Sequence, residues 1–539
     1  MGGDIGVSDT LKEIGIIVGE ASSSEFYFSS RPEEMPSRWE YVNVFSLEDA
    51  GGFLKEFPVV AQVQGIISES QALTKELDFD VTKKLVEAGI ADKRVWGKAR
   101  ILGYLTEKGE VLLPRRAVLP GKPVFKAPRE LLERFYSFPK EEAIHVGNLI
   151  TRSDVQVFLS LQGFRRHLAI IAQTGAGKSY LAGVIAEELL KKGATIIMLD
   201  PHADYVLLSR TAEGERHELS DNIIVFRNPS STGRYSEKEV GKVEPYEVCF
   251  SDLDFDEVCL IGRVSEHYVN IRSAIENAIK EVRKSKDVFS PRDVLEELQC
   301  IESLAQDRGE RSAARSAQKY IKRIMGMRVF TNVSTSIDRM LKPMQLSVVD
   351  LSGLEDEVSD YIAYKVLSEA YEKIANGEFK YPVFIFVEEA HRFIPPERQT
   401  YSSGIIRKIS AEGRKFGVFL VLISQRPSKI HQDALSQCNS QIIMRITNPE
   451  DQKAVSVSSE RMSRDLLEDL PGLNVGEAVI VGEMTRAPVM IKVKRRETRE
   501  GGADIDIVGK LKEALAVGRE SKSEEEIQRL RDELKGIYG

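Results

Sequence analysis

The chain has 539 residues, of which 42% are hydrophobic and 29% are charged, and this is enough apolar material for several domains with buried cores. The composition excludes a disordered chain, a collagen-like chain and a small disulfide-rich protein. The formal net charge is −8, so any affinity for nucleic acid must come from a local concentration of Lys and Arg.

The cysteines and the apolar runs bear on the compartment in which the protein is expected. Apolar runs such as residues 418–423 are far shorter than the ~20 residues that span a bilayer, and the first residues lack the apolar segment of a signal peptide. The cysteines are far apart and form no CxxC pair, which favours buried thiols over a zinc site or a disulfide framework. We therefore expect a cytoplasmic protein with no membrane contact. The cysteines are Cys249, Cys259, Cys300 and Cys438.

Residues 1–135 are expected to form a small β-barrel. Short runs that alternate apolar and polar residues are separated by turn residues, and Gly65, Gly97 and Gly103 lie inside these runs, where bulges or tight bends are expected. A helical hairpin is expected near residues 70–91. The predicted strands are 14–18, 26–29, 41–45, 59–67, 95–104 and 111–113.

Beyond residue 150 apolar runs alternate with helical patterns. Near-continuous apolar runs are typical of strands that helices cover on both faces, so we expect an α/β fold with a parallel sheet over 150–251 and 344–495. Helical periodicity alone fills 252–343, which predicts an all-α insertion, and a charged helical extension is expected over 496–539. The predicted strands are 168–172, 194–199, 346–351, 383–387, 418–424, 442–446, 478–481 and 489–493.

A phosphate-binding loop follows the strand predicted at 168–172. The run AQTGAGKS occupies residues 172–179, with Ala172 where the first glycine of a P-loop usually stands, and a helical pattern follows it. Glycines let backbone N–H groups converge on phosphate oxygens at the helix N-terminus, whereas a glycine-rich turn that binds nothing would not need this strand and helix. Lysine should reach the β- and γ-phosphates of ATP, and serine should bind Mg²⁺. The predicted nucleotide-binding residues of the loop are Gln173, Thr174, Gly175, Ala176, Gly177, Lys178, Ser179 and Tyr180.

Two acids stand where hydrolysis needs a carboxylate, at the end of the strand predicted at 383–387. Glu388 occupies the position that usually helps to hold Mg²⁺ and is commonly Asp, and Glu389 is expected to polarise the attacking water. The alternative is that both acids only cap the next helix.

Two further strand ends carry candidate catalytic residues. Asp200 follows the strand at 194–199 and, in a parallel sheet, would lie at the same edge as the P-loop. It could support the water or Mg²⁺, or it could form a structural turn. Gln425 follows the strand at 418–424 and could sense the γ-phosphate.

An arginine precedes the strand at 418–424. Arg414 is poorly placed to reach its own P-loop but could reach that of a neighbouring copy, where an arginine supplied in trans accelerates phosphoryl transfer by ~10³–10⁵. Arg165 and Arg166 are secondary candidates for a nucleotide contact of this kind. An ordinary surface arginine is the alternative.

Basic residues within the insertion could follow a nucleic-acid backbone. Spacing by four would align them on one face of a helix, although a solvated face or a contact with an acidic neighbour explains the pattern equally well. Arg407 and Lys408 form a second basic pair, in a segment that can face the central channel of a ring. The aligned residues are Arg311, Arg315, Lys319 and Arg323.

These motifs together resemble the HerA family of hexameric DNA-translocating ATPases, which are related to the FtsK motors. The P-loop, the run DPH at 200–202, the run EEAH at 388–391, the run GRKFG at 413–417 and the run SQRP at 424–427 occur in the order of that family. The resemblance implies a RecA-like P-loop core, an N-terminal HAS barrel that helps to assemble the ring and to dock a partner, and a C-terminal brace on a neighbouring subunit. It further implies the nuclease NurA as a partner, with Mre11 and Rad50 nearby, in the resection of double-strand DNA ends.

The expected function is that of an ATP-driven homohexamer that pumps duplex DNA through a central pore, with ATP and Mg²⁺ as cofactors. The first alternative is a related pump for single strands, as in conjugation or virion packaging. The second is a nucleotide-dependent scaffold without processive movement.

Overall fold

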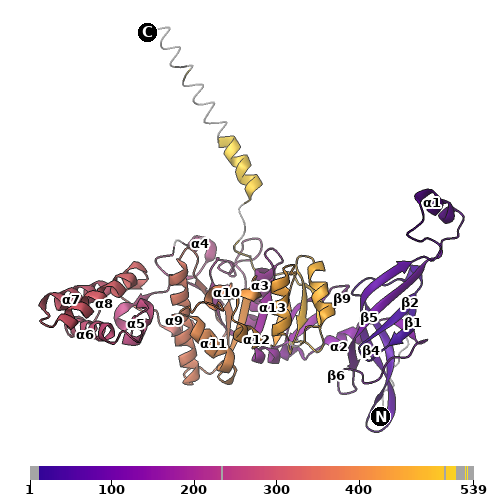
Figure 1. Cartoon of the computed structure of the whole chain (residues 1–539), viewed down its shortest axis with the longest axis horizontal. Coiled ribbons are helices and arrows are strands. Elements are labelled where there is room, and N and C mark those ends of the chain that lie inside the picture. Colours follow the sequence, from indigo (N-terminus) through magenta and orange to yellow (C-terminus); the bar gives the residue numbers. More distant parts are fainter. Residues whose placement is uncertain are drawn as a thin grey trace.

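The computed structural model describes residues 11–231, 233, 235–459, 461–502, 506–517, 529 and 531. The molecule is elongated, with a β-barrel at one end, an α/β body in the middle and a helical lobe at the other end (Figure 1). Within the described residues, no helix combines the length and the apolar character that a membrane crossing requires.

Six strands close the N-terminal barrel in the order β2-β1-β7-β3-β4-β5, and a β2–β5 pairing completes the circle of described strands. The predicted strands are confirmed, but the barrel is closed by β7, which the sequence pattern does not reveal. One short helix, α1 (Phe79–Glu87), replaces the expected helical hairpin. The strands are β1 (Glu13–Ala21), β2 (Glu25–Ser30), β3 (Tyr41–Asp49), β4 (Leu54–Glu69), β5 (Arg94–Leu105) and β7 (Pro123–Lys126), with β6 (Val111–Leu112) added beside β5.

The central sheet has twelve strands among the described residues. Its first eight strands are parallel neighbours, as the apolar runs predict, and its last four are antiparallel additions. In sheet order the strands are β13 (Val243–Pro245), β12 (Ile223–Arg227), β16 (Leu346–Asp350), β11 (Thr195–Asp200), β17 (Val383–Val387), β18 (Val418–Ser424), β10 (Leu168–Ile171), β19 (Ser440–Ile443), β20 (Glu477–Val481), β21 (Val489–Val493), β8 (Ala143–Leu149) and β9 (Arg152–Ser160).

Alternate residues of the parallel strands enter two different hydrophobic cores. Met198 of β11 packs in the core that contains Leu181 of α3 (Lys178–Lys191), whereas Leu199 packs in the core that contains Tyr361 of α9 (Asp356–Ala375). This alternation buries both faces of the sheet and explains the continuous apolar runs. The other helices of the body are α2 (Arg129–Tyr136), α4 (Glu237–Val240), α10 (Ala390–Phe393), α11 (Ser403–Glu412), α12 (Gln432–Ser436), α13 (Pro449–Ser458) and α14 (Arg464–Asp469).

Four helices form the lobe at the far end of the molecule. Asp254 and Asp307 cap the first and last of them by accepting hydrogen bonds from backbone N–H groups three residues later. The region expected to be wholly helical also contains a two-residue strand, β15 (Phe330–Thr331), which pairs with β14 (Val248–Cys249). The helices are α5 (Phe255–Gly262), α6 (Val269–Ser285), α7 (Pro291–Leu304) and α8 (Arg308–Gly326).

The C-terminal segment begins extended and only later becomes helical. After β21 the chain runs without regular structure to residue 502, and residues 507–517 form a helix that projects from the body (Figure 1). The predicted helical extension is therefore present but starts later than expected. The rest of it, at 518–528, 530 and 532–539, lies outside the described residues.

Candidate active site

The P-loop joins the carboxyl end of β10 to the N-terminus of α3. Gly175 and Gly177 have φ angles of +75° and +102°, which L side chains rarely adopt, so these two positions require glycine. The segment before β20 helps to hold the P-loop in place: the N–H of Gly476 donates to the carbonyl oxygen of Ala176 at 3.0 Å. Its N–H groups thus lie at a helix N-terminus, which is suited to phosphate.

A cavity of about 740 Å³ opens beside this loop. Residues from the P-loop, from the ends of β11, β17 and β18, and from the C-terminal segment share its wall, so elements far apart in the sequence meet there. Its lining residues are Gln173, Thr174, Gly175, Gly177, Lys178, Ser179, Tyr180, His202, Asp204, Glu389, Gln425, Val475, Gly476, Lys492, Val493, Glu500 and Gly502.

Lys178 and the acid pair are in direct contact. The Lys178 ammonium lies 3.3 Å from Oε1 of Glu389 and also pairs with Glu388. Glu388 is fully buried, accepts a hydrogen bond from the hydroxyl of Tyr205, and does not line the cavity. This placement favours an indirect role for Glu388, which holds the lysine, over the predicted contact with Mg²⁺.

Glu389 is the acid that faces the cavity. Its backbone has φ +50°, a left-handed conformation that is strained for a side chain and is frequent at functional sites. Burial acts to raise its pKa, but the imidazole of His391, whose Nδ1 lies 3.1 Å from Oε2 of Glu389, and the charge of Lys178 lower the pKa of Glu389 to about 2. The carboxylate is therefore charged at neutral pH, as an acceptor for a water proton must be.

Asp200 organises the turn that follows β11. Its carboxylate accepts hydrogen bonds from the backbone N–H groups of His202, Asp204 and Tyr205, at 3.3, 3.0 and 2.8 Å. Burial, and then the charge of Asp204, raises the pKa of Asp200. It does not line the cavity, so the geometry favours the turn-forming alternative over direct catalysis.

The turn brings a different acid to the P-loop. Oδ2 of Asp204 accepts a hydrogen bond from the Ser179 hydroxyl at 2.9 Å, and both residues line the cavity. Mg²⁺ in nucleotide sites is held by oxygen ligands from one or two protein groups and by substrate phosphates, so this pair of oxygen donors fits the ion. The sequence run DPHAD at 200–204 contains the signal for Asp204, although the position directly after the strand favours Asp200.

Gln425 also lies in the cavity, at the end of the strand next to β17. Its side-chain oxygen accepts a hydrogen bond from the hydroxyl of Thr174 in the P-loop. Gln173 is held in turn by Thr447, whose hydroxyl donates to the Gln173 side-chain oxygen at 3.0 Å. The predicted sensor position thus touches the phosphate-binding loop directly.

Arg414 and Arg166 lie away from this cavity. They occupy the short helices η7 (Gly413–Lys415) and η3 (Leu161–Arg166), which precede β18 and β10, and so lie at the sheet edge opposite the P-loop. Both are exposed, and neither lines the cavity. His167 directly follows Arg166 in the chain. Burial, and then the charge of Arg414, lower the pKa of His167 to about 4 despite its hydrogen bond to the carbonyl oxygen of Ser410. Any contact of these arginines with nucleotide requires a second copy.

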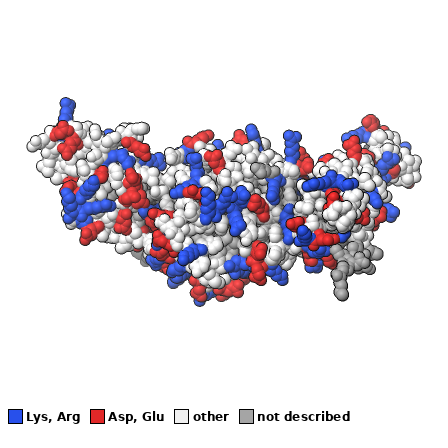
Figure 2. All heavy atoms as spheres, turned by 90° about the horizontal axis from the view of Figure 1, so that it is seen from below, with Lys and Arg blue, Asp and Glu red and all other residues white. Residues whose placement is uncertain are grey.

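The two predicted DNA-binding groups lie in different parts of the molecule. The α8 residues are in the helical lobe, whereas Arg407 and Lys408 are exposed on α11 in the body. Figure 2 shows that acidic and basic side chains intermingle over one face, with Lys and Arg denser near its middle. The α8 group consists of Arg311, Arg315 and Lys319, all exposed.

Three comparisons relate this chain to known proteins. Residues 144–370 match the family model described as the central domain of the helicase HerA. A probable helicase of Methanocaldococcus jannaschii is 30% identical over 520 residues, 93% of this chain and 94% of that protein. The DNA double-strand break repair helicase HerA of Pyrococcus furiosus is 30% identical over 558 residues, 92% of this chain and 96% of that protein. The structure of VirB4 of Thermoanaerobacter pseudethanolicus matches with a TM-score of 0.45 at 18% identity, over 67% of this chain and 98% of that one.

Proposed function

This chain belongs to the HerA family of helicases, and we propose that it is an ATP-driven translocase that pumps duplex DNA through the central pore of a homohexamer. One observation carries the proposal: the P-loop lysine, a charged buried carboxylate and a strand-end glutamine converge on one cavity. We further propose a barrel over 1–135, a core over 150–251 and 344–495, an insertion over 252–343 and a brace over 496–539.

The residues of the cavity divide the chemistry between them. Lys178 and the P-loop N–H groups bind the β- and γ-phosphates of ATP, and Glu389 orients water and accepts its proton. Gln425, in contact with Thr174, reports loss of the γ-phosphate to the loop after β18. Ser179 and Asp204 hold Mg²⁺, which when bound neutralises charge on the phosphate oxygens.

A second copy completes the site in this proposal. Arg414, together with Arg166, reaches the nucleotide of the neighbouring subunit and stabilises charge in the transition state. Support comes from the exposure of both arginines at the sheet edge opposite their own P-loop. The helix at 507–517 acts as a brace on a neighbouring copy.

DNA is proposed to pass along basic residues of α11 and α8. Arg407 and Lys408 face the pore, and Arg311, Arg315 and Lys319 contact the phosphate backbone. The partners are NurA and, nearby in the same process, Mre11 and Rad50, in the resection of double-strand breaks. Support for this process comes from the P. furiosus relative, which is named as a double-strand break repair helicase.

The first test replaces the proposed base. Glu389→Gln keeps the shape of the side chain, so ATP should still bind while hydrolysis falls by about 10²–10⁴-fold. Glu397→Gln, an exposed acid further along the chain, is the matched control. Turnover of Glu389→Gln near the wild-type rate would exclude the base role. Stimulation by single strands rather than blunt duplex would favour the single-strand pump, and no stimulation by either would favour the scaffold.

The second test examines the contribution of the neighbouring copy. Arg414→Ala should be inactive alone, but rings mixed in equal amounts with Glu389→Gln should regain activity, because about one quarter of random interfaces combine an intact base with an intact arginine. Mixtures no more active than the sum of the separate variants would contradict the assignment in trans. Electron microscopy with DNA and a non-hydrolysable ATP analogue would report the ring and the occupancy of its pore.

A further inference from the structure

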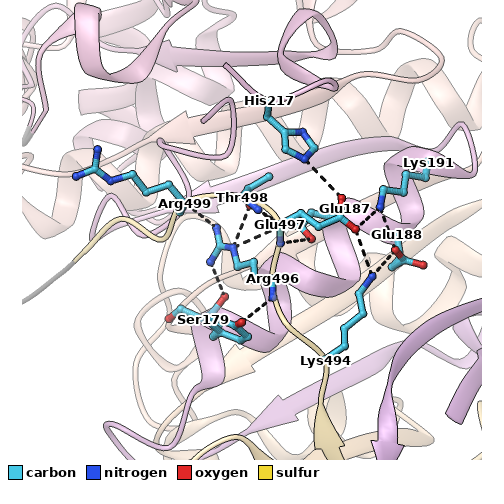
Figure 3. A network of polar contacts seen from close by, with 11 residues as sticks. Ser179, Glu187, Glu188, Lys191, His217, Lys494, Arg496, Glu497, Thr498 and Arg499 are labelled. Atoms are coloured by element: carbon cyan, nitrogen blue, oxygen red, sulfur yellow. Dashed lines mark hydrogen bonds and ion pairs between the residues drawn. The ribbon is translucent and has the colours of Figure 1, made fainter. Parts of the chain in front are cut away.

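The C-terminal segment crosses the P-loop helix before it leaves the body. We call residues 494–502 the strap. It follows β21 and lies along α3 (Figure 3). Its residues Glu500 and Gly502 line the nucleotide cavity. No local sequence pattern indicates this position, since the strap lies more than three hundred residues after the P-loop.

Arg496 lies at the centre of the strap and is almost completely buried, with 1% of its side chain exposed. Its guanidinium lies 3.7 Å from a carboxylate oxygen of Glu187 in α3, and it donates to the Thr498 hydroxyl at 3.0 Å. It also donates to two carbonyl oxygens, of Ser179 at 3.4 Å and of Arg499 at 3.1 Å. The contact with Ser179 reaches the residue that ends the P-loop (Figure 3).

The backbone of Arg496 adds a second link to the same turn of α3. Its N–H donates to the hydroxyl of Tyr180 at 2.6 Å. Gly183, one turn later in α3, makes room for the guanidinium, because a Cβ at that position would lie 2.5 Å from Cζ of Arg496. The arginine therefore packs against the first turns of α3 and contacts two consecutive residues, Ser179 and Tyr180.

The end of the strap is hydrogen-bonded to the turn at 200–204, which carries Asp204. The N–H of Gly501 donates to the carbonyl oxygen of Asp204 at 2.9 Å, and a Cβ on Gly501 would clash with the carbonyl oxygen of Ala203. The strap thus spans the two groups that meet at the cavity, the Ser179 hydroxyl and the Asp204 carboxylate.

A separate set of ion pairs joins the strap to α3. Lys494 pairs with Glu188 at 2.6 Å, and Glu497 pairs with Lys191 at 2.5 Å and lies 3.6 Å from His217 (Figure 3). These contacts do not involve Arg496, so they should keep the strap on α3 when that arginine is replaced.

We infer that Arg496 is a positioning residue for nucleotide binding: it holds Ser179 and Tyr180 against the turn at 200–204, so that the Ser179 hydroxyl and the Asp204 carboxylate stay aligned for Mg²⁺ and the phosphates. The inference rests on the proposed nucleotide site. It assigns to the C-terminal strap a part in ATP binding that is separate from any contact with a neighbouring copy.

The test compares two adjacent arginines in the full-length chain. Arg496→Met removes the buried guanidinium and keeps the volume, whereas Arg495→Met changes a residue that is 82% exposed and pairs with Glu213 at 3.2 Å. Binding of a fluorescent ATP analogue is measured with and without Mg²⁺, and unfolding is followed without nucleotide. Arg496→Met should weaken Mg²⁺-dependent binding about tenfold or more, and Arg495→Met by less than about twofold.

The kinetic pattern distinguishes positioning from general loss of structure. Arg496→Met should raise KM for ATP about tenfold while kcat at saturation changes less than about threefold, because loss of ground-state binding acts on KM. Arg496→Lys, which keeps the charge opposite Glu187, should recover part of the affinity.

Thr498→Val provides a milder variant that keeps the arginine and removes one of its acceptors, with an expected loss of about two- to fivefold in affinity. Wild-type affinity in both folded Arg496→Met and Thr498→Val would overturn the inference. Failure of the wild-type protein itself to bind nucleotide would instead overturn the proposed function.

Discussion

Asp469, in the α/β body, contacts three polar side chains of the barrel. Its carboxylate accepts hydrogen bonds from the guanidinium of Arg38 at 2.7 Å, from the indole N–H of Trp39 at 2.9 Å and from the guanidinium of Arg100 at 3.4 Å. Asp469→Asn keeps the shape of the side chain but removes the negative charge. We expect this change to weaken the docking of the barrel and to leave each of the two bodies folded.

The magnitude follows from the burial of the two arginines. The side chain of Arg38 is 51% exposed, so its pair with Asp469 contributes only about 0–1 kcal/mol. The side chain of Arg100 is 10% exposed, and burial lowers its pKa while the charge of Asp469 opposes that effect. Loss of the countercharge of a buried ion costs several kcal/mol, but asparagine retains a hydrogen-bond acceptor, so we expect a total loss of about 2–3 kcal/mol.

Amide hydrogen exchange reports the free energy of local opening at each amide, so it measures the loss of stability at the contact itself. A single global unfolding free energy would be less useful, because the barrel and the body need not unfold together. Amides at the contact between barrel and body should exchange roughly 30- to 160-fold faster in Asp469→Asn. Glu468→Gln, at an exposed neighbouring position with the same change in charge, is the control. Equal exchange in the two variants would refute the role of the buried link.

Three further predictions concern the site and the surface. The pKa of Glu389 in the folded protein is about 2, against an ordinary 4.5, so its charge stabilises the fold fully above pH ~4.5 and this stabilisation is lost as the pH falls toward 2. His391→Gln should raise the pKa of Glu389, so the acid limb of the ATPase pH–rate profile should move to higher pH. Gly183→Ala should cost about 1–3 kcal/mol in thermal unfolding because its Cβ meets a pinned guanidinium, whereas Gly404→Ala, which meets nothing within 4 Å, should be nearly neutral; equal costs would contradict the packing. Fluorescence anisotropy gives the slope of log binding constant against log salt concentration, which reports the number of phosphates that the protein neutralises. Replacing Arg311, Arg315 and Lys319 of α8 by Ala should reduce this slope by the equivalent of about three phosphate contacts, and an unchanged slope would exclude α8 from the DNA path.

The sequence predicts the P-loop and the parallel strands because their signals are local. The glycines around Lys178 and the buried runs of β10, β11 and β17 each need only one neighbourhood of the chain to be recognised. The carboxyl ends of parallel strands share one edge, which is why the sequence pattern alone predicts Glu389 and Gln425 beside the loop.

The rest depends on contacts between distant segments. The four residues of β7 become a strand only because β1 and β3 provide partners on both sides. The strands β8 and β9 join the central sheet only through β21, a strand that lies more than three hundred residues later in the chain. The contact of Arg496 with the P-loop helix could not be predicted either, because Ser179, Tyr180 and Glu187 lie on α3, more than three hundred residues earlier.

The strap also connects the nucleotide cavity to the projecting helix. Gly501 is tied to the turn at Asp204, and the helix at 507–517 begins a few residues later. Ile507, Leu511 and Leu515 are spaced by four on this helix and are 67%, 60% and 61% exposed, an apolar face that a second copy could cover. A brace of this kind would start at the same anchor that aligns Ser179 with Asp204.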